Sequence, residues 1–236
     1  MGDYTNMSYY YDVIMTSGYY DYEKIVDSLL NGQTGQRVLE IGCGTGLILE
    51  ELAKRQSQSS IAGIDLTQAM LNIAQERLKP FGNVSLSQQN VCSLDLPQQQ
   101  DLAFSYGGVW YFVVDGDKEP FMVSHIPDHE ANQLGLARVA QYIAKGGTLL
   151  LGIQGPHHDY AKPIANGMVY SQKIEPSAHG FTKHYFLNDG DTRLMAQTID
   201  YRTYSFAQAL EMMGVNGIEY APQENRGHLF LGFKKT

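Results

Sequence analysis

The chain has 236 residues, of which 43% are hydrophobic and 18% charged, and its formal net charge is −8 at pH 7. This composition supplies a large hydrophobic core and excludes an intrinsically disordered chain. The acidic balance, without any run of Lys and Arg, argues against a nucleic-acid partner, and no apolar run approaches the length of a membrane span.

The two cysteines, Cys43 and Cys92, show neither metal-ligand spacing nor a paired disulfide pattern. We therefore expect reduced thiols in a cytoplasmic protein, and the first residues show no signal-peptide pattern. No cluster of His, Asp and Glu predicts a metal site. The sequence leaves the oligomeric state open.

Residues 1–35 begin with a tyrosine-rich stretch and end in an amphipathic pattern. Six tyrosines fall within residues 9–22, and apolar residues then recur at helical spacing until Asn31 and Gly32 end the predicted helix. Tyrosine combines a large apolar body with a polar tip. The stretch therefore predicts either an aromatic shoulder packed on the main domain or a lid over a ligand.

From residue 36 onward the pattern alternates between strands and helices. This alternation predicts an α/β fold: a doubly wound, mostly parallel, seven-stranded sheet of the Rossmann-like kind. The predicted strands are 37–41, 60–65, 83–90, 101–108 and 148–154, and the predicted helices are 46–55, 67–81 and 129–147, the last closed by Gly146 and Gly147.

After about residue 155 the sequence pattern changes from alternating strands and helices to antiparallel hairpins. Two alternating runs joined by Asp189-Gly190 predict a β-hairpin within an inserted cap at about 155–204. A helix follows, and the last two strands predict a final antiparallel hairpin. We expect one domain over 36–236 that carries this small cap, preceded by the lid and helix of 1–35.

The segment "VLEIGCGTG" runs a buried strand directly into three alternate glycines, Gly42, Gly44 and Gly46. Such a turn lets a ligand approach the backbone at a helix N-terminus. Asp65 ends the next predicted strand, 19 residues after Gly46, where an acid accepts hydrogen bonds from ribose hydroxyls. The G-x-G-x-G spacing departs from the dinucleotide pattern, and Glu40 disfavours a pyrophosphate but not a ligand with an amino group.

Four segments in order, "VLEIGCGTG", "GIDLTQAML", "LSQQNVCSLDLP" and "DLAFSYGGVWYF", resemble the class I S-adenosylmethionine-dependent methyltransferase family of the small-molecule type. The resemblance implies S-adenosylmethionine as the cofactor. It implies that Asp65 holds the ribose hydroxyls. The other cofactor-binding positions that we expect are Tyr11, Glu40, Gly42, Cys43, Gly44, Gly46, Leu66, Met70, Asn90, Val91, Ser105, Tyr106 and Gly107. The family often has Asp where this chain has Asn90.

The acceptor site has no comparable motif. Aromatic residues of the predicted lid and of the segment after the fourth strand, together with a histidine after the fifth strand, are candidates to contact the substrate: Tyr19, Tyr20, Trp110, Tyr111 and His157. The catalytic group is unknown, with Tyr11, Trp110 and His157 as candidates. His157 and its neighbour His158 offer a general base or are solvated loop residues, and Trp110 contacts substrate or packs in the core.

These observations predict methyl transfer to a small-molecule acceptor, a nitrogen atom first, because the acidic balance and the tyrosines suit an amine. A hydroxyl oxygen is the alternative, followed by a carbon acceptor or a cofactor-binding protein without catalysis. The absence of basic patches argues against an RNA substrate. The glycine spacing and Glu40 argue against an oxidoreductase.

Overall fold

The computed structural model describes residues 4–32, 34–222 and 228–236. At its centre lie five parallel strands, in the order β3 (Val84–Gln88), β2 (Ser60–Asp65), β1 (Arg37–Ile41), β4 (Gln100–Ser105) and β7 (Ile143–Gln154). Because β1, β2 and β4 are nearly continuous apolar runs, they are buried between helices on both faces. The predicted parallel sheet is confirmed.

Three helices connect the parallel strands: α3 (Leu47–Arg55), α4 (Gln68–Leu78) and α5 (His129–Gln141). The prediction that Gly146 and Gly147 close the third of them is wrong. The helix ends at Gln141, and β7 already pairs with β4 at Ile143. The register then shifts before Thr148, and the glycines lie in this irregular stretch of strand.

The last hairpin completes the sheet. β13 (Phe230–Lys235) lies antiparallel to β7, and β12 (Ile218–Tyr220) lies antiparallel to β13. Together with the five parallel strands they form the expected seven-stranded sheet with an antiparallel end. The helix α6 (Phe206–Gly214) precedes this hairpin and begins with a capping box between Ser205 and Gln208.

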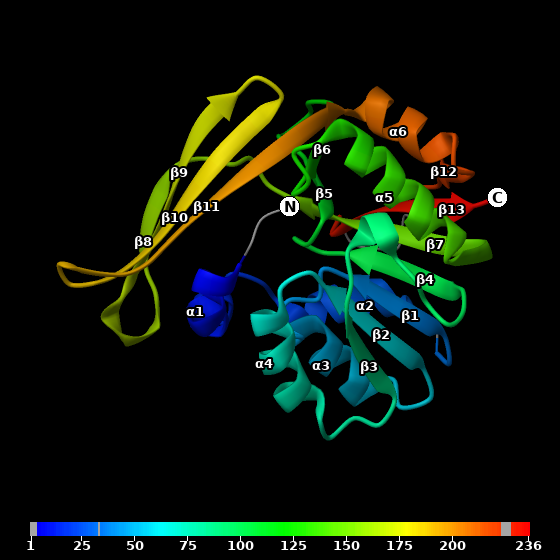
Figure 1. Ribbon diagram of the computed structural model, residues 1–236, viewed down its shortest axis with the longest axis horizontal. Coiled ribbons are helices and arrows are strands. Elements are labelled where there is room, and N and C mark those ends of the chain that lie inside the picture. Colours follow the sequence, from blue (N-terminus) through cyan, green and yellow to red (C-terminus); the bar gives the residue numbers. More distant parts are fainter. Residues whose placement is uncertain (1–3, 33, 223–227) are drawn as a thin grey trace.

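Four long antiparallel strands project from one side of the sheet (Figure 1). They are β8 (Tyr160–Pro163), β9 (Val169–Ser177), β10 (Gly180–Asp189) and β11 (Thr192–Ser205). We call them the cap. The strand β11 pairs with β6 (Phe121–Ser124), which pairs with β5 (Trp110–Val113), which pairs with β7. The sequence analysis did not anticipate β5 and β6, and these two strands make the cap continuous with the main sheet.

The N-terminal region forms two helices, α1 (Thr5–Met15) and α2 (Tyr22–Leu30). The second begins at Asp21, whose side chain accepts from the Lys24 N–H, and ends at Asn31 in the left-handed conformation, as expected. The first lies between the cap and α4 (Figure 1). It buries Met7 and Ile14 in a hydrophobic cluster shared with the cap strands, so α1 is packed against the cap.

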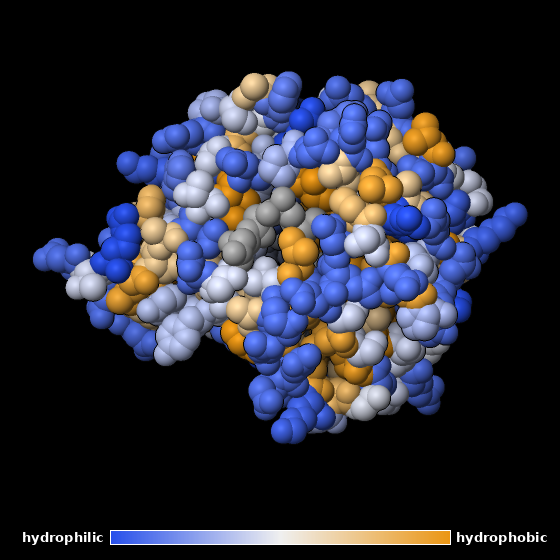
Figure 2. All heavy atoms as spheres, in the orientation of Figure 1, coloured by the Kyte–Doolittle hydropathy of each residue, from blue (hydrophilic) through white to orange (hydrophobic). Residues whose placement is uncertain are grey.

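Within the described ranges, no helix combines the length and the apolar character that crossing a bilayer requires. Hydrophilic residues cover most of the face shown in Figure 2, where hydrophobic residues occur in separate small groups.

Candidate active site

A cavity that is partly open to solvent lies at the carboxyl ends of β1, β2 and β4. The glycine turn after β1 and the first residues after β2 form one wall, α1 covers the opening, and β10 and β11 of the cap form the opposite wall. Ligands of open α/β sheets bind at this edge. The cavity therefore lies where the glycine turn predicts a ligand.

Gly42, Gly44 and Gly46 all have positive φ angles, of 78°, 53° and 79°, which L-residues rarely adopt. They differ in what a side chain would meet. A Cβ atom on Gly46 would lie 2.9 Å from a methyl carbon of Leu78, so this glycine allows α3 and α4 to pack closely. Gly42 and Gly44 instead line the cavity, and Gly44 faces the ring of Tyr11.

Asp65 ends β2 beside the glycine turn. Its two carboxylate oxygens accept hydrogen bonds from the backbone N–H groups of Gly44 at 2.9 Å and Thr67 at 2.8 Å. Burial raises the pKa of Asp65 above its ordinary value, and the two N–H donors oppose that shift. The carboxylate is thus fixed at the cavity wall, with lone pairs left for ligand hydroxyls.

Glu40 lies beneath the same turn and is only 2% exposed. Its Oε2 atom has no hydrogen-bond partner among the described residues. Burial, and then the charge of Asp65, raise its pKa well above the usual range. A buried carboxyl without a partner is costly, so the turn offers a place for a ligand with an amino group.

The helix α1 is attached to the cofactor side of the cavity through Asp12. The Thr45 hydroxyl donates to one carboxylate oxygen of Asp12 at 2.6 Å, and Arg77 pairs with the other. Arg77 also donates to the Thr45 carbonyl at 2.9 Å. These contacts hold Tyr11, one residue earlier on α1, over Gly44.

A chain of hydroxyl groups occupies the cap side. Tyr185 and Tyr201 lie 2.8 Å apart, Tyr201 and Tyr4 lie 3.3 Å apart, and Tyr4 lies 3.3 Å from Nδ1 of His125. Burial raises the pKa of each tyrosine and lowers that of His125 to about 3. All four groups are therefore neutral near pH 7.

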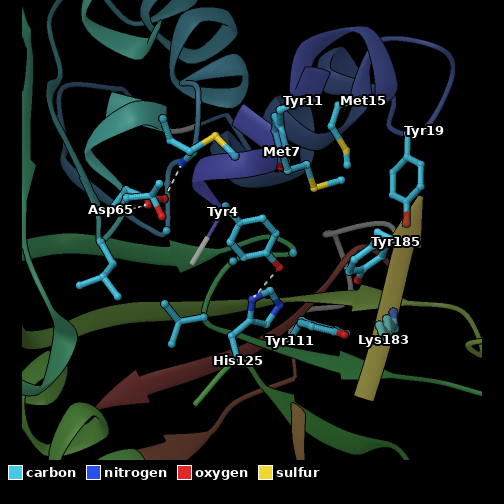
Figure 3. Close-up of a pocket in the computed structure, with 18 of the residues that line it drawn as sticks. Tyr4, Met7, Tyr11, Met15, Tyr19, Asp65, Tyr111, His125, Lys183 and Tyr185 are labelled. Atoms are coloured by element: carbon cyan, nitrogen blue, oxygen red, sulfur yellow. Dashed lines mark hydrogen bonds between the residues drawn. The ribbon is translucent and has the colours of Figure 1, made fainter. Parts of the chain in front are cut away.

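Lys183 lies at the cap end of the cavity. Figure 3 shows Asp65 at one side and Lys183 with Tyr185 at the other. The lysine is 4% exposed, and its closest described partners are the rings of Phe181 and Tyr201, whose centroids lie 5.6 and 5.4 Å from Nζ. Burial lowers its pKa to about 7.

A second depression, which we call the side groove, adjoins the cavity. The two share four lining residues: Tyr19, Tyr20, Gln154 and Lys183. In the groove, Nε2 of His157 lies 3.2 Å from Oε1 of Gln154, and burial lowers the pKa of His157 to about 3. His158 is exposed on the rim, beside the carbonyl of Pro156.

The structure brings part of the expected site together. The expected residues that line the cavity are Tyr11, Tyr19, Tyr20, Gly42, Gly44, Asp65, Leu66, Met70, Gly107 and Tyr111. Others lie outside it. Cys43 is buried behind the turn, Val91 lies in the core, and Asn90 accepts from the N–H of Cys92. Ser105 is fully buried and Tyr106 faces the side groove.

Trp110 also lies outside the cavity. Trp110 follows the fourth strand, as predicted, but it is the first residue of the unpredicted strand β5. Its side chain is 0% exposed and lies in the core. Its indole N–H donates to Oδ1 of Asn132 at 2.8 Å. Because side chains alternate along a strand, the next residue, Tyr111, faces the cavity instead. The position of Trp110 fits core packing and gives no contact to a ligand in this cavity.

Neither His125 nor Lys183 was among the site residues predicted from the sequence. The sequence does contain a pattern that points to Lys183. Every second residue of β10 from Phe181 to Leu187 lies on one face of the strand, and Lys183 is the one charged residue among them. No such pattern points to His125, because it follows β6, a strand that was not predicted.

The chain matches a family model described as "Methyltransferase domain" over residues 38–147. This match covers just under half of the chain, and it contains the motifs that resemble the class I S-adenosylmethionine-dependent methyltransferase family. The resemblance implies S-adenosylmethionine as the ligand of the glycine turn. Its donors and acceptors fit the turn: two ribose hydroxyls suit the Asp65 carboxylate, and an amino group suits the environment of Glu40.

Two curated relatives show the extent of the similarity. The chain is 26% identical over 180 residues to trans-aconitate 2-methyltransferase of Methylobacterium nodulans, a match that covers 74% of this chain and 62% of that protein. It is 27% identical over 199 residues to a ubiquinone biosynthesis O-methyltransferase of Xanthomonas campestris pv. campestris, covering 83% of this chain and 71% of that one. The first match thus spans less than two thirds of the relative's length.

Solved structures share the fold over nearly the whole chain. CalS10, an amino pentose methyltransferase from Micromonospora echinaspora, superposes with a TM-score of 0.66 at 16% identity, over 96% of this chain and 97% of that one. The sugar N-methyltransferase KedS8 from Streptoalloteichus superposes with a TM-score of 0.63 at 17% identity, over 96% and 93%. At these identities the likeness concerns the fold.

Proposed function

We propose that the protein transfers a methyl group from S-adenosylmethionine to a small molecule enclosed in the cavity. The observation that carries the proposal is the position of the cavity, which joins the glycine turn and Asp65 to the tyrosine- and lysine-bearing wall of the cap. In this proposal residues 1–35 act as lid and helix, and the cap at about 155–204 belongs to the domain 36–236.

The cofactor side follows from the lining. We propose that Asp65 holds the ribose hydroxyls, that Leu66 and Met70 border the adenine, and that Gly42 and Gly44 border the methionine part. S-adenosylmethionine supplies an electrophilic methyl group on a sulfonium with a good leaving group. The protein then has to exclude water and align the nucleophile, which accounts for large rate effects, and α1 with the cap supplies this enclosure.

We propose nitrogen first as the acceptor atom. Tyrosine rings form much of the cavity wall, and aromatic faces attract the positive charge that a nitrogen atom acquires as it takes up the methyl group. The cation at Lys183 disfavours a second positive charge nearby, so an amine bound there is favoured in its neutral, nucleophilic form. The structural neighbours named as amino pentose and sugar N-methyltransferases agree with this choice.

A hydroxyl oxygen is the second candidate, and one contact favours it. The hydroxyl of Tyr4 is hydrogen-bonded to the neutral His125 inside the cavity, and this pair can hydrogen-bond a hydroxyl acceptor and orient it. A relative named as an O-methyltransferase is consistent with it.

The test is incubation of the protein with a metabolite extract and methyl-labelled S-adenosylmethionine, followed by mass spectrometry. We expect one class of small molecules to gain label, and fragmentation of the product identifies the methylated atom. Gly44→Val, which places a side chain at the turn, is the inactive control. If no molecule gains label above that control across extracts while the cofactor binds, the protein binds cofactor without transferring its methyl group.

A further inference from the structure

Lys183 is a buried cation that the protein itself does not neutralise. Its side chain is 4% exposed, and among the described residues its contacts are two aromatic rings, with no hydrogen bond or ion pair. A buried charge without a partner is unfavourable, and proteins normally pair it. The missing partner is a feature that a ligand can supply.

The surroundings of Lys183 exclude an internal counter-ion. Asp65 is the single acidic residue among those that line the cavity, and it lies at the opposite wall (Figure 3). The residues that line the side groove include no acid. The basic side chains close to Lys183 are His125 and His157. After burial, the positive charge of Lys183 further lowers the pKa of each histidine.

The side groove adds further polar groups without partners. Nδ1 of His157 and Oε1 of Gln172 are buried and have no hydrogen-bond partner among the described residues, and Gln172 is 4% exposed. The other end of the Gln172 amide is fixed, since Nε2 donates to the His158 carbonyl at 2.7 Å. Because the Gln154 amide oxygen accepts from Nε2 of the neutral His157 ring, Nδ1 carries a lone pair, so both unpaired atoms are acceptors for a hydroxyl or amino group of a ligand whose anionic group meets Lys183.

We propose that Lys183 binds an anionic group of the acceptor molecule, a carboxylate or a phosphate. This inference rests on the proposed function and adds the class of substrate. The acceptor then extends from the cavity, where its nucleophile meets the methyl group, toward the side groove, where its anionic group meets Lys183. Lys183 acts as a positioning residue in this arrangement.

The pH dependence follows from the free protein. Lys183 loses its charge above about pH 7, because burial disfavours the ammonium form. His125 and His157, whose pKa values are lowered to about 3, stay neutral through this range, and Tyr201 keeps its proton. Binding of an anion therefore requires proton uptake by Lys183 above pH 7, and affinity falls as the pH rises.

The first experiment observes Lys183 directly. Protein with 13C-labelled lysine and bound S-adenosylhomocysteine is titrated with sodium acetate and, separately, with inorganic phosphate at constant ionic strength. We expect a saturable shift of the Lys183 signal and a rise of its titration midpoint by one unit or more. A response to acetate alone assigns a carboxylate, and a response to phosphate alone assigns a phosphate. If Lys183 responds to neither more than the exposed Lys173, the inference is wrong.

The second experiment uses the acceptor found with labelled cofactor. We expect Lys183→Met to raise its KM tenfold or more, the size of a lost charge-assisted hydrogen bond, without changing S-adenosylhomocysteine affinity, while Lys173→Met changes neither. In wild type KM rises above pH 7, and in Lys183→Arg it stays constant. An acceptor that carries no anionic group, or a KM unchanged in Lys183→Met, overturns the inference and leaves the proposed methyl transfer intact.

Discussion

The two walls of the cavity are built in different ways. The cofactor wall comes from one short stretch between Gly42 and Met70, and its contacts are largely backbone N–H groups and a single fixed carboxylate. The cap wall comes from side chains of α1, β5, β10 and β11, and from His125, which are far apart in the sequence. In the proposed function the first wall binds the cofactor, and the second suits a particular acceptor.

Charge separates the two walls as well. Asp65 is the acidic residue of the cofactor wall, whereas the cap end carries Lys183. The net charge of −8 therefore says nothing about the charge that the acceptor meets. The sequence-based preference for an amine acceptor rested on the tyrosines and on that net charge, and the cap wall gives the second ground no support.

Removal of α1, which lies over the cavity between the two walls, should lower turnover more than any other change considered. Deletion of residues 1–20 takes away α1 and Tyr11 while leaving the parallel sheet. We expect turnover to fall about a hundredfold or more, because alignment is lost. Circular dichroism checks that the sheet remains. Full activity in a folded truncated protein would mean that α1 only packs against the cap.

Asp65→Ala should act on the cofactor wall alone. Loss of a charge-assisted hydrogen bond costs about 1.5–3 kcal/mol, so we expect S-adenosylmethionine to bind tenfold more weakly or worse. Calorimetry measures this affinity, with Asp189→Ala in the exposed hairpin of the cap as the matched control. Unchanged cofactor affinity in folded Asp65→Ala would remove Asp65 from the cofactor site.

His125 should make the free energy of unfolding depend on pH, because it is buried in the neutral form in the cap wall. Burial holds its folded pKa near 3, against an ordinary value of 6.5. Between these values the unfolded chain takes up a proton that the folded protein does not, so stability is lost as the pH falls below 6.5. From pH 7.5 to 5.5 this amounts to about 1.4 kcal/mol. Urea titrations should show a shallower pH dependence in His125→Phe, and equal slopes would contradict the buried neutral state.

The attachment between Asp12 and Arg77 should give the smallest effect, because both side chains are partly exposed. We expect a coupling of about 0.5–1 kcal/mol in a double-mutant cycle of Asp12→Ala and Arg77→Met, measured by urea unfolding. The single variants should lower turnover only a few-fold. Additive variants would show that the contact does not hold α1 in place.

The two walls also differ in how far the sequence predicts them. The strand–glycine–Asp65 arrangement is local, so spacing alone indicates its position at one sheet edge. The cap wall depends on the pairing of β6 with β11 and of β5 with β7, which brings residues such as His125 and Tyr201 together. Trp110 shows the same limit: β5 was not predicted, and a difference of one residue along that strand decides whether a side chain faces the core or the cavity.

A crystal structure of the protein with S-adenosylhomocysteine tests the central claim most directly. We expect the ribose hydroxyls within hydrogen-bond distance of Asp65 and the sulfur directed toward the tyrosine-bearing wall, with the space around Lys183 left open for an acceptor. A ligand bound elsewhere, or one that fills the Lys183 end of the cavity, would contradict the division of the site into a cofactor wall and an acceptor wall.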